Sequence, residues 1–244
     1  DDAAGCTRRG QMWGKGEDGV ADQTQAVIFL QRGCDGGNAD GCAWLGTAYG
    51  RVIGGVDFDA KKALDLYQRA CDSGSADGCF WLGEAYEDGS GVKADVKRAA
   101  ELYDKSCTMG AANACRVLGW AYAEGIGLRI DLAKAAKLYQ TACDGEDAIG
   151  CNNLAFMYME GTGAIEVDRA KANNLFERGC TLGEEHSCFQ LGVAYEKGNG
   201  VTKDVGKARE LYEKGCNNGD KGACNSRAYI RKNADHNASD ALPL

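Results

Sequence analysis

The 244-residue sequence has little proline, little histidine and no excess of positive charge. A single Pro excludes collagen-like and proline-rich chains, whose extended backbones depend on that residue. Lys and Arg number 28 against 36 Asp and Glu, so the net charge is -8 and the pI about 4.9. Such a chain lacks the basic surface that binds a phosphate backbone, and we expect no nucleic-acid partner.

Long apolar runs are also absent. The longest clear run, 26–30, is far shorter than the roughly 20 residues that a membrane-spanning helix needs. The hydrophobic content of 44% is nevertheless enough for a core. We therefore expect a folded chain without a transmembrane segment. Its first residue is Asp1 rather than Met, which favours a mature or trimmed product whose targeting segment has been removed.

What the chain has in excess is glycine (35) and cysteine (13). Twelve of the cysteines form pairs whose members are eight positions apart, and the pairs recur every 36 or 37 residues. A fixed period of this length is typical of a solenoid built from repeated units. The pairs are Cys34 and Cys42, Cys71 and Cys79, Cys107 and Cys115, Cys143 and Cys151, Cys180 and Cys188, and Cys216 and Cys224.

Each period predicts two helices. An aspartate stands twelve positions before the first cysteine of every pair and is followed by apolar residues at helical spacing, as in 59–71, which predicts an N-cap and a buried stripe. We name this the B helix. After the second cysteine, Leu-Gly and then Tyr share one face, as in 42–49, which predicts the A helix, whose glycine lets a neighbouring backbone come close.

The link from an A helix to the next B helix carries Gly-x-Gly, for example Gly89-Ser90-Gly91. Glycine accepts a positive φ, so this pattern predicts a tight antiparallel turn. A phosphate cradle is the alternative. Recurrence in successive repeats, ahead of an aspartate cap and in an acidic chain, favours the turn.

The combined motif, Cys-x-x-Leu-Gly-x-x-Tyr, Gly-x-Gly, Asp, Lys/Arg-Ala-x-x-Leu-Tyr and Cys-x7-Cys, resembles the Sel-one-like repeat, a relative of the tetratricopeptide repeat. More narrowly, it resembles the disulfide-rich Helicobacter cysteine-rich proteins. The resemblance covers roughly residues 6–232 and implies an all-α fold, a right-handed α/α superhelix (solenoid) of about 36-residue helix pairs. We predict one solenoid over residues 1–232 with a partial first repeat and a polar C-terminal capping helix, followed by a flexible tail over 233–244.

Each cysteine pair spans a corner between a B helix and the next A helix, so we predict a disulfide within every pair, and the resemblance implies the same pairing. Closing the nine-residue segment stabilises the fold by about 2 to 3 kcal/mol in the chain-entropy model. Six disulfides imply a secreted or periplasmic location. Cys6 has the phase of a second member whose mate would precede Asp1, so we expect it to be unpaired; a reactive thiol is the alternative.

Metal and catalytic motifs are scarce. Cys-x2-Cys never occurs, and only His186 and His236 accompany the thiols, so we expect no metal or cofactor. The family resemblance implies weak penicillin-binding or β-lactamase activity, and Ser90-Gly91-Val92-Lys93 does match Ser-x-x-Lys. The accompanying Ser-Asp-Asn and Lys-Thr-Gly motifs are missing, and Ser90 falls in a repeat turn. We therefore assign no catalytic residue and favour a non-enzymatic function.

The sequence favours a rigid, monomeric scaffold that binds a protein or peptide in a concave groove lined by the A helices. On a helical wheel, positions one and five after the second cysteine face away from the core leucine. Aromatic residues there predict anchors, and Arg116 and Asn152 predict polar contacts; packing against a neighbouring helix is the alternative. A weak β-lactamase-type hydrolase and an immunity-type protein that neutralises a secreted toxin are the alternative functions. The predicted binding residues are Phe80, Glu84, Arg116, Trp120, Asn152, Phe156, Phe189 and Val193.

Overall fold

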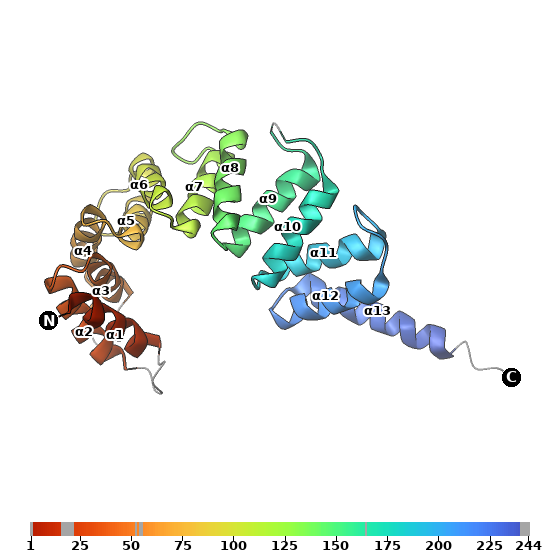
Figure 1. The fold of residues 1–244 in the computed structure, drawn as a ribbon, viewed down its shortest axis with the longest axis horizontal. Coiled ribbons are helices and arrows are strands. Elements are labelled where there is room, and N and C mark those ends of the chain that lie inside the picture. The colour runs from red at the N-terminus through yellow and green to blue at the C-terminus, as the bar shows by residue number, and fades with distance from the viewer. Residues whose placement is uncertain (1, 16–21, 52, 54–55, 164, 240–244) are drawn as a thin grey trace. The chain divides into compact units, whose positions relative to one another are not determined.

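A computed structural model describes residues 2–15, 22–51, 53, 56–163 and 165–239, and side chains up to residue 232. These residues form thirteen α-helices and no strand, which confirms the predicted all-α class (Figure 1). No helix among them is both long and apolar enough to cross a membrane. The helices are α1 (Ala3–Lys15), α2 (Gln23–Asp35), α3 (Ala39–Arg51), α4 (Ala60–Asp72), α5 (Ala76–Asp88), α6 (Val96–Thr108), α7 (Ala112–Glu124), α8 (Leu132–Asp144), α9 (Ala148–Glu160), α10 (Arg169–Thr181), α11 (Glu185–Lys197), α12 (Val205–Asn217) and α13 (Lys221–Ser239).

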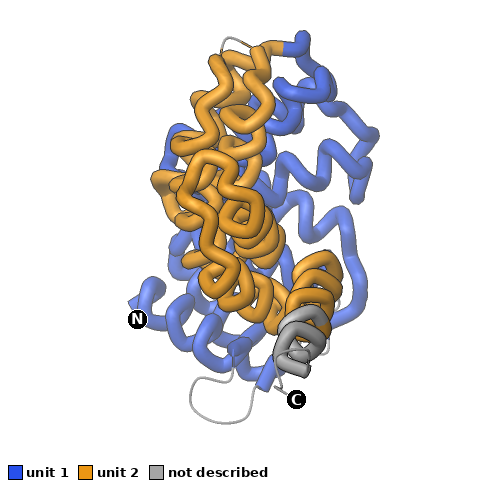
Figure 2. The backbone as a smooth tube through the Cα atoms, turned by 90° about the vertical axis from the view of Figure 1, so that its right-hand side faces the viewer, with its two compact units in different colours: residues 1–130 blue, residues 131–244 orange. Residues whose placement is uncertain are grey.

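The chain divides into two compact units, residues 1–130 and 131–244 (Figure 2). Unit 1 contains α1 to α7 and unit 2 contains α8 to α13. Inside each unit every helix packs on the next one in the chain, and some odd-numbered helices also contact each other, as α3 does α5 and α11 does α13. The odd-numbered helices are the A helices and the even-numbered ones the B helices. The single solenoid over residues 1–232 stays a prediction.

The repeated aspartates cap the B helices, as predicted. The Asp95 carboxylate accepts the backbone N–H groups of Lys97 and Arg98 at 3.1 and 3.0 Å. A cap of this kind is worth about 1 kcal/mol, because it satisfies amides that have no partner inside the helix. The other five caps make the same kind of bond and are Asp22, Asp59, Asp131, Asp168 and Asp204.

The Gly-x-Gly turns are confirmed as turns. Both glycines of each have a positive φ, 74° at Gly89 and Gly91 and between 66° and 75° in the other three. The second glycine also packs against the preceding B helix: a Cβ at Gly91 would lie 2.5 Å from the Ala60 carbonyl oxygen. The turn of one repeat therefore rests on the first turn of the B helix one repeat earlier, where no side chain fits.

All six predicted disulfides are present, with Cα–Cα distances of 4.4 to 4.7 Å. Each joins the end of a B helix to the first turns of the following A helix. Cys6, on α1, is the one cysteine outside a disulfide, as predicted, and it is half-buried. The bonds join Cys34 to Cys42, Cys71 to Cys79, Cys107 to Cys115, Cys143 to Cys151, Cys180 to Cys188 and Cys216 to Cys224.

The second cysteine of each pair also shows how tightly the corner is closed. The Cys42 sulfur lies 3.6 Å from the carbonyl oxygen of its partner, Cys34. The equivalent distance is between 3.7 and 3.8 Å in the other five corners, so the repeats share one corner geometry. The sulfur atoms in those five corners belong to Cys79, Cys115, Cys151, Cys188 and Cys224.

The core is formed by the A-helix leucines and the B-helix aromatic rings. Leu82 and Leu118 are almost fully buried, and so is Tyr103 between them in the chain. The Leu-Gly glycine was expected to admit a neighbouring backbone, and this is corrected: a Cβ at Gly83 would lie 2.7 Å from Tyr103 Cε1, so the glycine receives a ring. A tyrosine ring needs that space because the two helices of a repeat pack closely.

The last helix extends further than the sequence suggested. α13 runs to Ser239, so the predicted tail begins inside a helix. Between residues 233 and 239 the chain has neither glycine nor proline to end the helix, and the one proline is at 243. Residues 240–244 lie outside the described residues. In this predicted capping helix, Arg231 is exposed and Arg227 is half-buried.

Candidate functional site

The predicted binding residues of unit 1 lie on α5 and α7. Phe80 is buried, only 8% exposed, with its ring 5.6 Å from that of Tyr103. Glu84 and Arg116 are half-buried, and Trp120 is 45% exposed. Trp120 is thus the large aromatic side chain that this face of unit 1 offers most openly to solvent.

The predicted binding residues of unit 2 lie on α9 and α11. The Phe156 ring packs against Phe176 of α10 at 5.2 Å, and Phe189 packs against a ring of α12, Tyr212, at 5.8 Å. Asn152 is buried and accepts a hydrogen bond from Ser187 Oγ at 3.2 Å. Val193 is half-buried and packs against the α12 core cluster.

Positions one and five after the cysteine do not both face away from the core. The expected orientation holds for Trp120, but Phe80 and Asn152 are buried. The helical wheel took the leucine as the only core direction, whereas an A helix packs against a B helix and against neighbouring A helices. The rings of Phe80, Phe156 and Phe189 at these positions therefore reach the following B helix. The role of the eight residues in binding stays a prediction.

Sequence reasoning missed three cavities in unit 1, spaced one repeat apart. They lie between α1, α2 and α3, between α3, α4 and α5, and between α5, α6 and α7, with volumes of about 190, 170 and 10 Å³. Their walls use the same repeat positions, 36 or 37 residues apart. The repeat period of the sequence therefore contained the information that could have located them. One position holds Trp44, Trp81 and Val117, a second Thr47, Glu84 and Trp120, and a third Leu30, Tyr67 and Tyr103.

We name these the first, second and third cavities. The second combines aromatic and charged walls: Trp81, Glu84 and Asp88 come from α5, Tyr67 from α4 and Arg51 from α3. Burial raises the pKa of Glu84 above its ordinary value; Arg51 opposes the rise, and Asp88 adds to it. The Tyr67 and Trp81 ring centroids are 5.8 Å apart. The cavity therefore holds a partly desolvated carboxylate beside indole and phenol rings.

Unit 2 has a different feature, a row of three rings in contact with His186 at its centre. The imidazole lies 5.9 Å from the Phe156 ring and 5.7 Å from Phe189. Its Nδ1 is 3.1 Å from Asp220 Oδ2, and its Nε2 is 3.0 Å from Gln190 Nε2. A neutral ring with its proton on Nδ1 satisfies both, donating to Asp220 and accepting from Gln190. His186 thus links α11 to α9 and to the residue that precedes α13.

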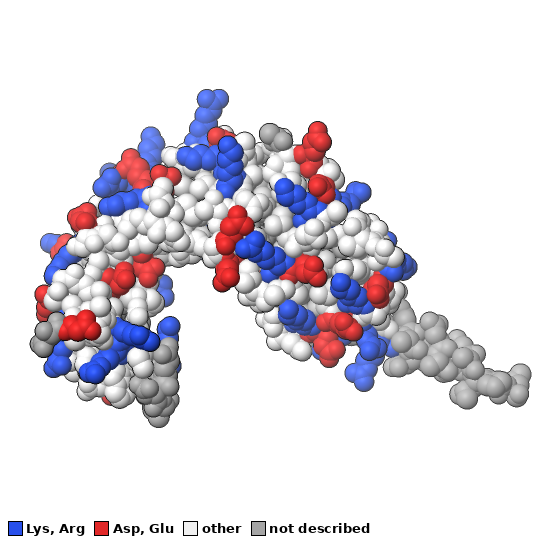
Figure 3. Space-filling view, in the orientation of Figure 1, with Lys and Arg blue, Asp and Glu red and all other residues white. Residues whose placement is uncertain are grey.

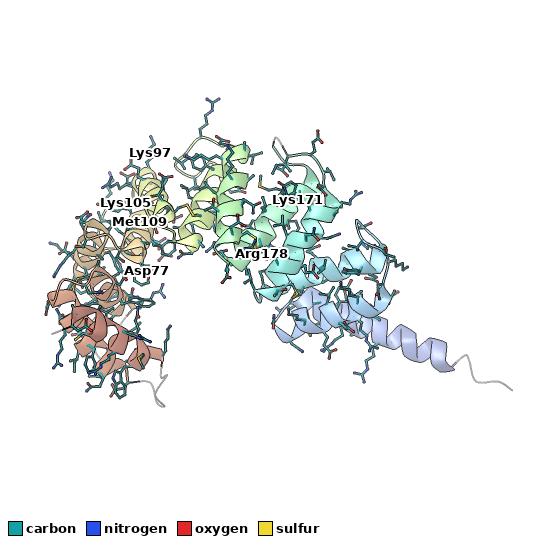
Figure 4. All side chains as sticks on the ribbon, in the orientation of Figure 1. Asp77, Lys97, Lys105, Met109, Lys171 and Arg178 are labelled. Carbon is teal, nitrogen blue, oxygen red and sulfur yellow. A yellow bond between two sulfur atoms is a disulfide. The ribbon has the colours of Figure 1, made fainter. Side chains whose placement is uncertain are left out.

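Several basic side chains join neighbouring helices, within one repeat or between two (Figure 4). Lys105 Nζ donates to the Cys71 carbonyl oxygen at 3.1 Å, at the end of the B helix one repeat earlier. Arg178 donates to the Asp144 carboxylate at 3.1 Å and to the Asp144 carbonyl oxygen at 3.3 Å, at the end of α8. Lys171 Nζ lies 2.7 Å from the Tyr158 hydroxyl. Figure 3 shows acidic and basic side chains intermingled on the visible face of each unit, not a basic stripe.

Ser90 lies in the turn after α5, with its backbone N–H bonded to the Ala85 carbonyl oxygen at 2.9 Å. It is exposed and lines the second cavity. The Ser-x-x-Lys match therefore does not begin a helix. In the described part of the chain, no three His, Cys, Asp or Glu side chains come together as a metal site.

The repeat is also recognised by a family model. The model of the Sel1 repeat matches six consecutive segments that cover most of the chain, and each segment holds one A helix and the B helix after it. The chain belongs to the Sel1 repeat family. The disulfides of this Sel1 repeat protein therefore link each repeat to the element that follows it. The matched residues are 3–38, 39–75, 76–110, 112–147, 148–184 and 185–220.

Several solved structures share the fold. A protective antigen of uropathogenic Escherichia coli matches with 28% identity and a TM-score of 0.80 over 94% of this chain, which spans only 49% of that chain. A Sel1 repeat protein from Oxalobacter formigenes matches with 25% identity and a TM-score of 0.79, over 89% of this chain and 86% of its own. An immunity protein from Pseudomonas aeruginosa, Pa5087, matches with 21% identity and a TM-score of 0.61, over 91% and 83%. No curated protein sequence matches.

Proposed function

We propose that this Sel1 repeat protein is a secreted or periplasmic scaffold that binds a polypeptide partner on the A-helix face of unit 1. The six disulfides support an oxidising compartment outside the cytoplasm. The observation that carries the binding role is the row of cavities beside the exposed Trp120. Concave pockets next to a large aromatic side chain are the usual anchoring points of protein interfaces.

Rigidity supports the same function. Each disulfide removes conformational freedom at a corner between repeats, so a partner meets a face that is already ordered. Binding then costs less entropy than it does on a flexible surface. In unit 1 the side chains that we propose for contact are Phe80, Glu84, Arg116 and Trp120, of which Phe80 acts by supporting the face from below. In unit 2 the corresponding residues, Asn152, Phe156, Phe189 and Val193, contact neighbouring helices, so we place the binding face on unit 1.

The test begins with the oxidised protein as bait in the periplasmic extract and culture medium of its source, followed by identification of the retained polypeptide. Calorimetry with that purified polypeptide then compares the wild type with Trp120→Ala. We expect the variant to lose more than about 1 kcal/mol of binding free energy with little loss of stability. Tyr229→Ala, which removes an aromatic side chain 64% exposed on α13, is the matched control and should bind normally. Equal affinity of Trp120→Ala and wild type would contradict the proposal.

The hydrolase is the second candidate, because Ser90 lines the second cavity. It requires the oxidised protein to hydrolyse nitrocefin faster than its Ser90→Ala variant does. Equal rates of nitrocefin hydrolysis by the two proteins would leave the polypeptide-binding scaffold as the proposed function. An immunity-type role is a special case of polypeptide binding in which the captured partner is a secreted toxin.

A further inference from the structure

The first and second cavities have equivalent positions in successive repeats but different chemistry. We propose that they take two side chains of one extended peptide segment of the partner, an apolar side chain in the first cavity and a lysine or arginine in the second. The inference rests on the proposed polypeptide-binding function and specifies the partner's chemistry.

The first cavity suits an apolar side chain. Most of its wall surface is apolar and comes from side chains that include Val27, Leu30, Trp44, Ala48 and Ile53. The polar side chains of the walls are Gln11, Lys15, Gln23 and Thr47. Its volume of about 190 Å³ is close to that of an engineered apolar cavity, about 150 Å³, which binds benzene. A leucine or phenylalanine side chain is of this size, and burying it there removes apolar surface from water.

The second cavity suits a cation. Its lining has two carboxylates, Glu84 and Asp88, one turn apart on α5, against one guanidinium, Arg51. Two further charges act on Glu84, Glu87 of the same helix and Arg116 of α7, and they offset each other. The charged groups around Glu84 therefore leave one unit of negative charge uncompensated. Burial holds the Glu84 carboxylate in partial desolvation, where a cationic partner interacts more strongly than it does in bulk water. An acidic ligand would be repelled by this excess negative charge and by the net charge of the chain, which is -8.

The aromatic walls of the second cavity favour the same occupant. Trp81 and Tyr67 both line it. The negative face of an aromatic ring attracts an ammonium or guanidinium group, and tryptophan does so best. The aliphatic stem of lysine or arginine packs on such rings while its charged end reaches the carboxylates. A cation is thus matched along its whole length.

The spacing of the two cavities fits an extended peptide. They are separated by one repeat, and neighbouring packed helices lie about 8 to 10 Å apart. In a polyproline II conformation, side chains three residues apart point the same way and are about 9 Å apart. An apolar residue and a basic residue at that separation therefore reach both cavities. At the third position Trp120 and Ile126 are among the walls and about 10 Å³ remains, so the row ends there.

The inference is tested by selecting binders from a library of random linear peptides displayed on phage. We expect the peptides bound by the oxidised wild type to share an apolar residue and a lysine or arginine three positions apart. Affinities of a selected synthetic peptide are then measured for the double variant Glu84→Gln, Asp88→Asn. Because these changes keep the side-chain size and remove only charge, they leave the fold intact, and affinity should fall at least tenfold.

A matched control removes the same charge elsewhere in unit 1. Glu101→Gln with Asp104→Asn changes two exposed carboxylates of α6, and it should bind the peptide within twofold of wild type. Replacing the basic residue of the peptide by glutamine should weaken binding to the wild type at least tenfold but to the double variant of Glu84 and Asp88 much less. The affinity for wild type should also fall as the pH is lowered toward 4, because Glu84, whose pKa burial raises, becomes protonated.

Three results would overturn the inference: peptides without a basic residue, equal binding by the double variant of Glu84 and Asp88, or no selected peptide at all. The proposed function has its own readout, the affinity of the captured polypeptide for Trp120→Ala. A partner that depends on Trp120 but is indifferent to Glu84 and Asp88 would overturn the two-cavity inference alone.

Discussion

The A-helix faces of the two units place different side chains at the same repeat position. Five residues after the second cysteine, unit 1 has Glu84 and Trp120, which line cavities. Unit 2 has Phe156, which lies against Phe176 and the His186 ring. The aspartate caps of the B helices and the disulfide corners recur in both units. The repeat therefore supplies a common framework of caps and disulfides, and single side chains decide whether the space between two repeats is open or filled.

Removing a disulfide should give the largest effect, and the same effect in both units. Cys71→Ala with Cys79→Ala, and Cys180→Ala with Cys188→Ala, each open a nine-residue segment. We expect each pair of changes to lower the free energy of unfolding by about 2 to 3 kcal/mol, measured by urea denaturation. A loss below about 1 kcal/mol in one unit only would show that the two frames are not equivalent.

Truncating the ring that stands five residues after the second cysteine should destabilise unit 2 more than unit 1. Phe156→Ala removes contacts with two rings and should lower the free energy of unfolding by about 2 kcal/mol. Trp120→Ala should cost much less, since that side chain is 45% exposed. Thermal unfolding of both variants decides the point. A larger loss for Trp120→Ala would place Trp120 in the core and contradict the contrast.

The Leu-Gly glycine should tolerate no methyl group where a ring covers it. Gly83→Ala would bring a Cβ to 2.7 Å from Tyr103, and such overpacking costs about 1 to 3 kcal/mol. Unit 2 already has an alanine, Ala155, at this position. Gly14→Ala is the control, because the nearest atoms lie 3.8 Å away, and it should leave stability unchanged or slightly raised. Equal stability of both variants would remove the packing argument.

The smallest effect concerns Asp77, in the first turn of α5. Burial, and then the nearby Asp40, raise the pKa of Asp77. The folded state therefore binds more protons than the unfolded state just above pH ~4, so the unfolding free energy contributed by this group falls as pH rises through that range. Asp77→Asn should show a smaller fall than wild type between pH 4 and 7 in denaturation curves. An identical pH profile would show that Asp77 is not perturbed.

Much of the frame was predictable from the sequence, because its determinants are local. The aspartate caps, the glycine turns and the eight-residue cysteine spacing each act within one helix or one corner, and all were confirmed. The contacts of the side chains on the A-helix face were harder to predict. Burial of Phe80 depends on Tyr103 of the next helix, and the His186 contact with Asp220 joins residues 34 positions apart. Such pairs are set by the packing of whole helices, which a single helical wheel does not contain.

Hydrogen–deuterium exchange of the oxidised protein, alone and with its captured polypeptide, shows which helices the partner covers. We expect the partner to slow exchange mainly in α3, α5 and α7, while exchange in α9 and α11 changes little. Slower exchange confined to α9 and α11, or to the B helices α4 and α6, would contradict binding on the A-helix face of unit 1.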